Sequence, residues 1–316
     1  MKKPLKLIPV AKDYIWGGTK LKTHFNKQAD SSIVAETWEL SVFEGAESLL
    51  QQGACDCNNL AELREKHPDW FGVAGSGHFP VLVKLIDATN DLSVQVHPTD
   101  DYAITVENSL GKTEMWYIVD AEQDGAIYLG FSKDVTLQQV EQAIRENKLT
   151  CLLNKIPVKK GDCYLVPAGT VHAILHGVTV VEVQQNSNIT YRLYDYGRVD
   201  ANGVPRQLHV EKALNVLQLQ AFKDVTCTKQ IDANRKLLAT CKYFTATQIM
   251  VDGTVDLHND NSFVAITVFE GNGCFADGTQ ISKGDTWFIP CGYSATIIGV
   301  LSLIATTVDS EQQKSF

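Results

Sequence analysis

Short runs of apolar residues, separated by turn-forming residues, recur along most of the chain. The runs are rich in Val, Ile, Tyr and Phe, and each has the length of a strand rather than of a helix. This pattern predicts a mainly β protein, a sandwich or barrel of antiparallel strands, with strands at Phe79–Ile86, Leu92–His97, Glu114–Val119, Ala126–Phe131, Cys163–Val166, Gly177–Gln184, Phe263–Phe269, Thr286–Pro290 and Ala295–Ala305.

Helical periodicity is confined to a few segments. It is clearest at 136–149, where Leu137, Val140 and Ile144 recur at helical spacing and Thr136 can cap the first turn. Weaker helical patterns cover 58–65 and 210–217. We therefore expect only a small helical contribution to the fold.

A ten-residue segment occurs twice in the chain. Lys160–Gly169 reads KGDCYLVPAG and Lys283–Gly292 reads KGDTWFIPCG, and each copy follows a hydrophobic strand. Such self-similarity indicates two related β units. We expect a first domain at 1–220, with a helical insertion at 131–159 and with residues before about 75 adding strands and cover, and a second domain at 221–316.

The composition of the chain argues against a nucleic acid partner, a membrane span and export. The 316 residues include 28 Lys and Arg and 37 Asp and Glu, a net charge of −9 that disfavours a nucleic acid partner. No stretch approaches the roughly 20 apolar residues of a membrane span, and the first residues lack the hydrophobic region of an export signal. Eight cysteines are too sparse for a disulfide scaffold, so we expect reduced thiols and a cytoplasmic protein.

The repeated segment has a recognisable spacing of Gly, five residues, Pro, one residue, Gly, two residues and His. It resembles the second motif of the cupin jelly roll, and four residues match it at every position: Gly161, Pro167, Gly169 and His172. The second copy has Ala295 at the position of the histidine. The resemblance implies two cupin-type jelly-roll units, or double-stranded β-helices, of which the second is degenerate and lacks metal ligands.

Candidate metal ligands lie upstream of His172. Gln95 and His97 are two residues apart, so on a strand both side chains point to the same face. Glu114 lies on the next plausible inner strand, and Lys112 shares its face. Two histidines and a carboxylate, with an amide and a water, suit Zn²⁺ with an open position, although Fe²⁺ or Mn²⁺ would also fit. We expect one metal ion per chain, with zinc favoured.

Six segments together resemble the class I mannose-6-phosphate isomerases, or phosphomannose isomerases, of the short bacterial form. The similarity is strong over roughly the first 220 residues, and the segments are Tyr14–Gly18 (YIWGG), Ala35–Ser41 (AETWELS), Val94–Pro98 (VQVHP), Gly111–Trp116 (GKTEMW), Pro167–His172 (PAGTVH) and Tyr191–Tyr196 (YRLYDY). The resemblance implies a zinc enzyme that interconverts mannose 6-phosphate and fructose 6-phosphate, with a small phosphosugar as its partner.

The resemblance also implies roles for individual residues. His97, Glu114 and His172 become the zinc ligands, Gln95 a weaker fourth ligand, and Arg192 the active-site arginine. Longer members of the family read Asn-His-Lys-Pro-Glu where this chain has LGKTE at 110–114. The lysine and glutamate persist, but the histidine does not, so no role of that histidine carries over to this chain.

Aldose–ketose isomerisation moves a proton between C1 and C2 through an enediol, so the site must stabilise charge on an oxygen. We expect Lys112 and Arg192 to offset negative charge at the enediolate or at the phosphate. The spacing does not identify the general base, which could be a metal-held water, Lys112 or a carboxylate such as Glu182 or Asp195.

Further residues and other functions remain open at this point. Trp16 is either a wall residue or a stacking surface for the sugar, and Arg198, like Arg206 and His209, is a candidate phosphate contact. A different cupin metalloenzyme or a non-catalytic cupin sugar-binding protein would carry many of the same features. The sequence does not indicate the oligomeric state.

Overall fold

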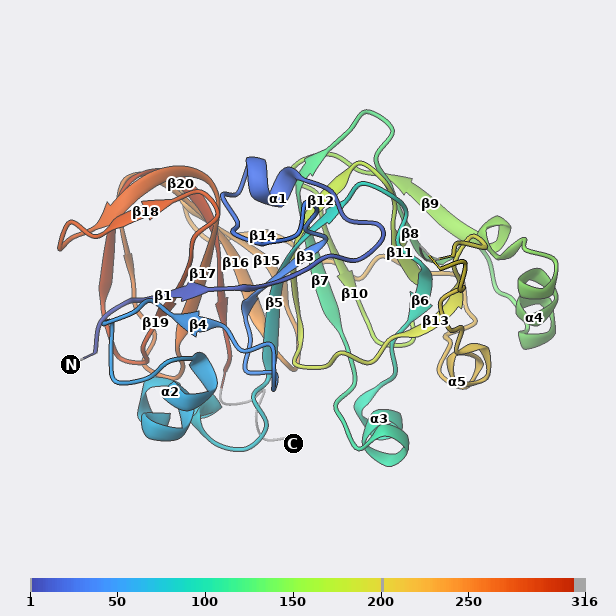
Figure 1. The fold of residues 1–316 in the computed structure, drawn as a ribbon, viewed down its shortest axis with the longest axis horizontal. Coiled ribbons are helices and arrows are strands. Elements are labelled where there is room, and N and C mark those ends of the chain that lie inside the picture. The colour runs from blue at the N-terminus through green and yellow to red at the C-terminus, as the bar shows by residue number, and fades with distance from the viewer. Residues whose placement is uncertain (1, 200–201, 310–316) are drawn as a thin grey trace.

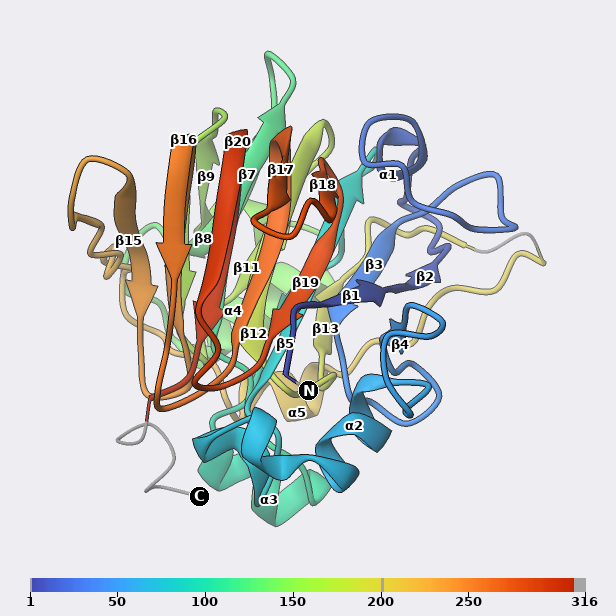
Figure 2. The same ribbon diagram turned by 90° about the vertical axis from the view of Figure 1, so that its left-hand side faces the viewer.

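The computed structural model describes residues 2–199 and 202–309, and antiparallel strands dominate that part of the chain. The strands form three sheets, which Figure 1 and Figure 2 show from two directions. Each predicted strand overlaps an observed one, which confirms the mainly β class. Among the described helices, none has the length and apolar character that crossing a membrane requires.

The largest sheet is built mostly from the C-terminal part of the chain, coloured orange and red in Figure 1. Its order is β14–β15–β16–β20–β17–β19–β1–β4, and β18 pairs with β17. The strands span Lys229–Gln230 (β14), Arg235–Thr240 (β15), Thr245–Leu257 (β16), Val264–Phe275 (β17), Gln280–Ser282 (β18), Thr286–Ile289 (β19), Ala295–Thr307 (β20), Leu5–Ile8 (β1) and Leu49–Leu50 (β4).

The other two sheets come from the first two thirds of the chain. The six-stranded sheet has the order β10–β7–β12–β5–β3–β2, with strands at Cys163–Val166, Glu114–Ala121, Val178–Gln185, Val81–Ala88, Glu36–Leu40 and Val10–Lys12. The five-stranded sheet has the order β13–β6–β11–β8–β9, with strands at Tyr191–Tyr194, Val94–Val96, His172–Ile174, Ala126–Phe131 and Leu153–Pro157.

The helices are short and lie around the sheets (Figure 1). They span Lys20–Thr23 (α1), Leu60–Lys66 (α2), Asp100–Glu107 (α3), Leu137–Arg145 (α4) and Val210–Leu214 (α5), with 3₁₀ turns at Pro68–Trp70, Val73–Gly75 and Leu149–Leu152. The expected cap of α4 is present as a capping box between Thr136 and Gln139. The pattern at 131–159 did not predict β9, and α3 was also not predicted.

The internal repeat extends from the sequence to the strand pairing. In the first copy Val166 pairs with Glu114, and in the second Ile289 pairs with Val264. His172 begins β11 and Ala295 begins β20. The second copy therefore has Val264 and Ala295 where the first has the candidate ligands Glu114 and His172.

The six-stranded sheet is the middle layer of the molecule. Alternate residues of β7 point to opposite faces: Met115, Tyr117 and Val119 join a buried core shared with the nine-stranded sheet. Glu114 and Trp116 point to the other face, toward the five-stranded sheet. β12 and β5 alternate in the same way, so one face of this sheet is largely apolar and the other carries most of the buried charged groups of the site.

Residues before 75 contribute to both halves of the fold. β2 and β3 extend the six-stranded sheet, as expected. β1, however, pairs with both β19 and β4, so β1 and β4 belong to the nine-stranded sheet. Phe71 lies 4.6 Å from Phe288, ring centroid to ring centroid, in the core between the halves. The N-terminal segment therefore connects the two halves rather than only covering the first.

A buried ion pair also joins the two halves. Lys27 Nζ lies 2.6 Å from Glu39 Oε1, and the side chains are 5% and 0% exposed. Lys27 also donates to the carbonyl of Gly284, and Thr286 donates to Glu39, so residues of both halves satisfy the pair. Removing one partner of such a pair leaves a buried charge without compensation.

We predict that Lys27→Met lowers the free energy of unfolding by about 3 to 5 kcal/mol. Lys27→Met combined with Glu39→Gln should recover most of the loss, because no buried charge then remains. Lys20→Met, which breaks a more exposed pair with Asp120, is the control and should change the value by less than about 1 kcal/mol. Urea unfolding of the four proteins measures this, and equal losses in Lys27→Met and Lys20→Met would contradict it.

Candidate metal centre and active site

Three buried side chains from different strands meet between the five- and six-stranded sheets. His172 begins β11, Glu114 begins β7, and His97 directly follows β6. The Nε2 atoms of His97 and His172 lie 3.5 and 3.3 Å from the two oxygens of Glu114. One ligand atom from each of the three lies within 4.8 Å of the others, which is close enough for a single metal ion.

Hydrogen bonds on the far side of each ring orient the two histidines. His97 Nδ1 lies 2.7 Å from the carbonyl oxygen of Ile189, and His172 Nδ1 lies 2.8 Å from that of Thr170. A carbonyl only accepts, so each Nδ1 carries the proton and each Nε2 presents a lone pair toward Glu114. Burial and the charge of Lys112 lower the pKa of His97 to about 3, and burial lowers the pKa of His172. Both rings are therefore neutral, the form that binds metals.

Glu114 is fully buried and has unsatisfied oxygens. Lys112 Nζ lies 2.6 Å from Oε2 as an ion pair, but no described group donates a well-aligned hydrogen bond to either oxygen. Burial alone would raise the pKa of Glu114, but the positive charge of Lys112, with the two histidines beside the carboxylate, outweighs burial and holds that pKa well below its ordinary value. A buried, ionised and under-bonded carboxylate beside two imidazole lone pairs fits a divalent cation.

His172, Gln95 and Arg192 form a row across three neighbouring strands of the five-stranded sheet, β11, β6 and β13. Gln95 pairs with His172 on one side and with Arg192 of β13 on the other. Gln95 Nε2 lies 3.4 Å from His172 Nε2. A 180° rotation of the Gln95 side-chain amide would place its oxygen beside the three candidate ligands instead. Because neighbouring strands lie about 4.8 Å apart, the backbone of Arg192 lies two strands, roughly 10 Å, from that of His172.

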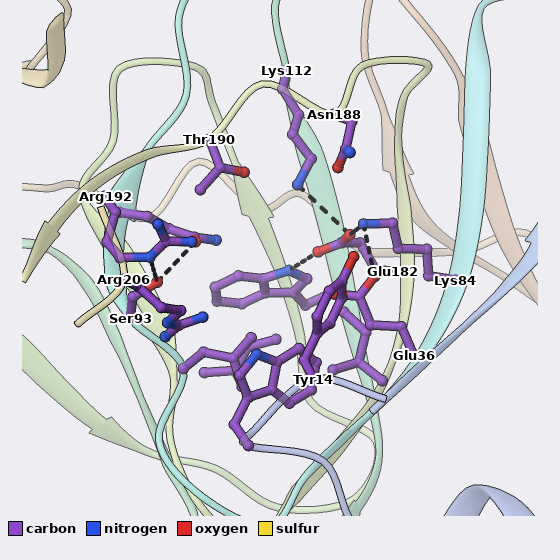
Figure 3. Close-up of a pocket in the computed structure, with 16 residues that line it drawn as sticks. Tyr14, Glu36, Lys84, Ser93, Lys112, Glu182, Asn188, Thr190, Arg192 and Arg206 are labelled. Atoms are coloured by element: carbon purple, nitrogen blue, oxygen red, sulfur yellow. Dashed lines mark hydrogen bonds and ion pairs between the residues drawn. The ribbon is translucent and has the colours of Figure 1, made fainter. Parts of the chain in front are cut away.

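A cavity of about 290 Å³ opens beside this row. Of the residues proposed from sequence, six line it: Trp16, Gln95, Lys112, Glu182, Arg192 and Arg206. Arg198 and His209 do not. Figure 3 shows its labelled residues in two groups: Lys112, Lys84, Glu182 and Glu36 lie on one side, and Arg192, Arg206 and Ser93 on the other.

The first group is a network of buried charges. Lys84 lies 3.3 Å from Glu36 and 3.6 Å from Glu182, and Lys112 lies 3.7 Å from Glu182. Trp116 donates to Glu182 Oε2, but Oε1 accepts no hydrogen bond from a described group. Burial raises the pKa of Glu182 against the opposing charge of Lys112, and the charge of Glu114 adds to the rise.

The second group contains arginines. Arg192 Nε donates to Ser93 Oγ at 3.1 Å, and one of its terminal nitrogens donates to the carbonyl of Gln207 at 2.8 Å. Arg206 lines the cavity and pairs with Asp195. Asp195, proposed from sequence as one possible base, is instead bound to arginines and does not line the cavity.

Sequence reasoning did not single out Lys84 or Glu36. Lys84 carries a signal, because it is the one cation within the run VLVKLI of β5, all of whose residues are buried. A charged side chain in a fully buried strand needs partners, and such residues gather at functional sites. Glu36 lies within the segment AETWELS, in which no spacing distinguishes it from Glu39.

Cys55, Asp56 and Cys57 form the other described group that could hold a metal. They lie on the loop before α2, and Asp56 is exposed. Burial raises the pKa of Cys57 to about 12, and a thiol must lose its proton to bind a metal. The two histidines and Glu114 therefore fit a resident ion better.

Comparison with known proteins gives a consistent family. Residues 5–121 match the family model of the phosphomannose isomerase type I catalytic domain. Mannose-6-phosphate isomerase ManA of Bacillus subtilis is 39% identical over 296 residues, which cover 92% of this chain and 93% of that protein. The mannose-6-phosphate isomerase of Streptococcus mutans is 34% identical over 295 residues, with 92% and 93% covered.

Solved structures agree with the sequences. The crystal structure of a mannose 6-phosphate isomerase from Bacillus subtilis matches with a TM-score of 0.89 and 34% identity, over 97% of this chain and all of that one. Phosphomannose isomerase from Salmonella typhimurium is 15% identical with a TM-score of 0.79, which shows a shared fold. With 34 to 39% identity over more than nine tenths of its length, the chain belongs to the type I phosphomannose isomerase family.

Proposed function

We propose that the protein is a mannose-6-phosphate isomerase, an enzyme that interconverts mannose 6-phosphate and fructose 6-phosphate. The observation that carries this function is the buried group of His97, Glu114 and His172 beside a charged cavity, in a chain of this family. The cavity of about 290 Å³ is near the lower end of the usual range for small-molecule sites, which suits a hexose phosphate.

We assign Zn²⁺ to the three buried ligands, with one ion per chain and Gln95 as a weaker fourth ligand. Two histidines and a glutamate are a common ligand set of catalytic zinc sites with an open position. When bound, the ion would act as a Lewis acid toward the sugar oxygens at C1 and C2. The buried, unsatisfied oxygens of Glu114 support this assignment.

The charged groups of the cavity supply the rest of the chemistry. Lys112 is buried and carries a positive charge between Glu114 and Glu182, where it can stabilise negative charge on a sugar oxygen during enediol formation. Glu182 lines the cavity and has an oxygen without a hydrogen bond from a described group. We assign the proton transfer between C1 and C2 to Glu182, because its raised pKa makes the ionised form a better base.

Two further residues complete the proposed site. Arg192 lies one strand beyond Gln95 and offsets charge that develops on the substrate oxygens. Trp16 lines the cavity with its ring 5.7 Å from that of Tyr14 and offers an apolar surface to the sugar ring. Arg198 stays a prediction from sequence, and the phosphate-binding comparison described below tests it.

The repeated strand pairing supports the finer description of the fold. We infer two cupin-type jelly-roll units, the first at 1–220 with the metal centre and the second at 221–316 without ligands, and both ranges include residues outside the described part. The equivalent pairs Val166–Glu114 and Ile289–Val264 support this division. A cytoplasmic location follows from the sparse cysteines and remains a prediction.

The assay that tests the function couples fructose 6-phosphate formation to a measurable product, with mannose 6-phosphate as substrate. We expect turnover that chelation abolishes and zinc restores. A protein that binds mannose 6-phosphate without converting it would be a sugar-binding member of the fold instead, and would contradict the proposal.

We predict about one zinc ion per purified chain, measured by elemental analysis. The double variant His97→Ala, His172→Ala should lose it, because one carboxylate cannot hold the ion alone. Cys55→Ser with Cys57→Ser is the matched control and should keep the ion, since it changes the other candidate group. Metal content that follows the cysteines rather than the histidines would overturn the assignment.

We predict that Arg192→Ala lowers kcat by roughly 10² to 10³, as for the loss of one electrostatic donor to the transition state, while zinc remains bound. If Arg192 only bound the phosphate, KM would rise and kcat would stay nearly intact. Steady-state kinetics with mannose 6-phosphate distinguish these results, and a normal kcat at saturation would exclude the catalytic role.

A further inference from the structure

Arg192 and Arg206 lie at the side of the cavity away from Lys112 (Figure 3). Arg206 shares a buried carboxylate, Asp195, with a third arginine, Arg198. Asp195 is 5% exposed and accepts hydrogen bonds from both Arg198 and Arg206. Arg206 forms a bidentate pair, with Nε 2.7 Å from Oδ2 and a terminal nitrogen bound to Oδ1. Such a pair uses only one edge of the planar guanidinium.

The two arginines bound to Asp195 differ in where they lie. Arg198 also donates to the backbone carbonyls of Asp91 and Asp195, and its guanidinium lies 5.1 Å from the ring centroid of Tyr196. It does not line the cavity, whereas Arg206 does. Arg198 is therefore held in the wall by the protein itself, and Arg206 is placed to meet a ligand.

The charges at this end of the cavity favour a dianion. Three guanidinium groups and one carboxylate leave a net charge of +2, while a phosphate monoester carries about −1.5 to −2 at neutral pH. Burial lowers the pKa of Arg192, and the charge of Arg206 lowers it further, so these cations repel one another. A bound phosphate would relieve that repulsion.

We propose that Arg206 binds the phosphate group of the substrate and that Asp195 is the positioning residue that holds its guanidinium at the cavity wall. Arg206 then determines the preference for a phosphosugar over the free sugar. The inference rests on the proposed function for the identity of the sugar, but phosphate binding itself can be measured without any turnover.

The first test measures binding of inorganic phosphate to the zinc-loaded protein by calorimetry. Arg206→Ala should weaken binding about 10- to 100-fold, the value of a charge-assisted hydrogen bond. Arg235→Ala is the matched control and should bind normally, because Arg235 also pairs with an aspartate and donates to a carbonyl but lies elsewhere. Loss of binding in Arg198→Ala with none in Arg206→Ala would overturn the proposal.

The second test compares mannose 6-phosphate with unphosphorylated mannose. Arg206→Ala should raise KM for mannose 6-phosphate about 10-fold or more with kcat nearly retained, and should leave kcat/KM for mannose unchanged. An equal loss for both sugars would overturn the proposal. If the parent protein converts neither sugar, the proposed function fails, while the phosphate titration still decides the role of Arg206.

The third test separates positioning from a structural role of Asp195. Asp195→Asn should reduce the preference for the phosphorylated sugar in the parent protein but not in the Arg206→Ala background, because Asp195 acts through Arg206. Equal effects in both backgrounds would show a structural role and contradict the proposal. Arg206→Lys keeps the positive charge but cannot form the bidentate pair, so we expect an intermediate phosphate affinity. If Arg206→Ala does not fold, Arg206→Lys serves as the background in which Asp195→Asn is tested.

Discussion

The site depends on burying charged groups on one face of a sheet whose other face is largely apolar. Lys84, Lys112, Glu114 and Glu182 are all nearly inaccessible, and taking each charge out of water costs several kcal/mol before pairing. The opposite face of the same strands packs into the core shared with the nine-stranded sheet. That apolar contact is one source of the stability that offsets the cost of the charges, and it fixes the strands that carry them.

This arrangement gives the C-terminal half a physical role, although its interior has no counterpart of the ligands. Val264, Ile289 and Ala295 occupy the positions equivalent to Glu114, Val166 and His172, and they pack in an apolar cluster of their own. The C-terminal half therefore needs no ion to complete its core. The C-terminal half provides the apolar surface against which the six-stranded sheet packs. β1, at the start of the chain, pairs with β19 at that surface.

The sequence predicted those features that local pattern determines. Short apolar runs between turn-forming residues located the strands, and the spacing of Gln95 and His97 placed both side chains on one face. It did not predict that β1 pairs with β19, because no local signal records which sheet edge is free. Lys84 was not singled out for a related reason, because a lysine in a strand becomes a site residue only through distant partners such as Glu36 and Glu182. Arg206 was named only as one of three candidate phosphate contacts, because its pair with Asp195 and its place in the cavity wall depend on how the loop folds.

The cavity has opposite electrostatic preferences at its two ends. Around the metal centre, Lys84 and Lys112 face Glu36, Glu114 and Glu182, so the buried charges sum to −1 with neutral histidines and favour a cation. Around Asp195, the three arginines favour an anion. A substrate with a phosphate at one end and hydroxyl and carbonyl oxygens at the other meets a complementary partner at each end in only one orientation. The field of the cavity therefore sets which carbon atoms lie beside Glu182 and Lys112, before any single contact selects between sugars.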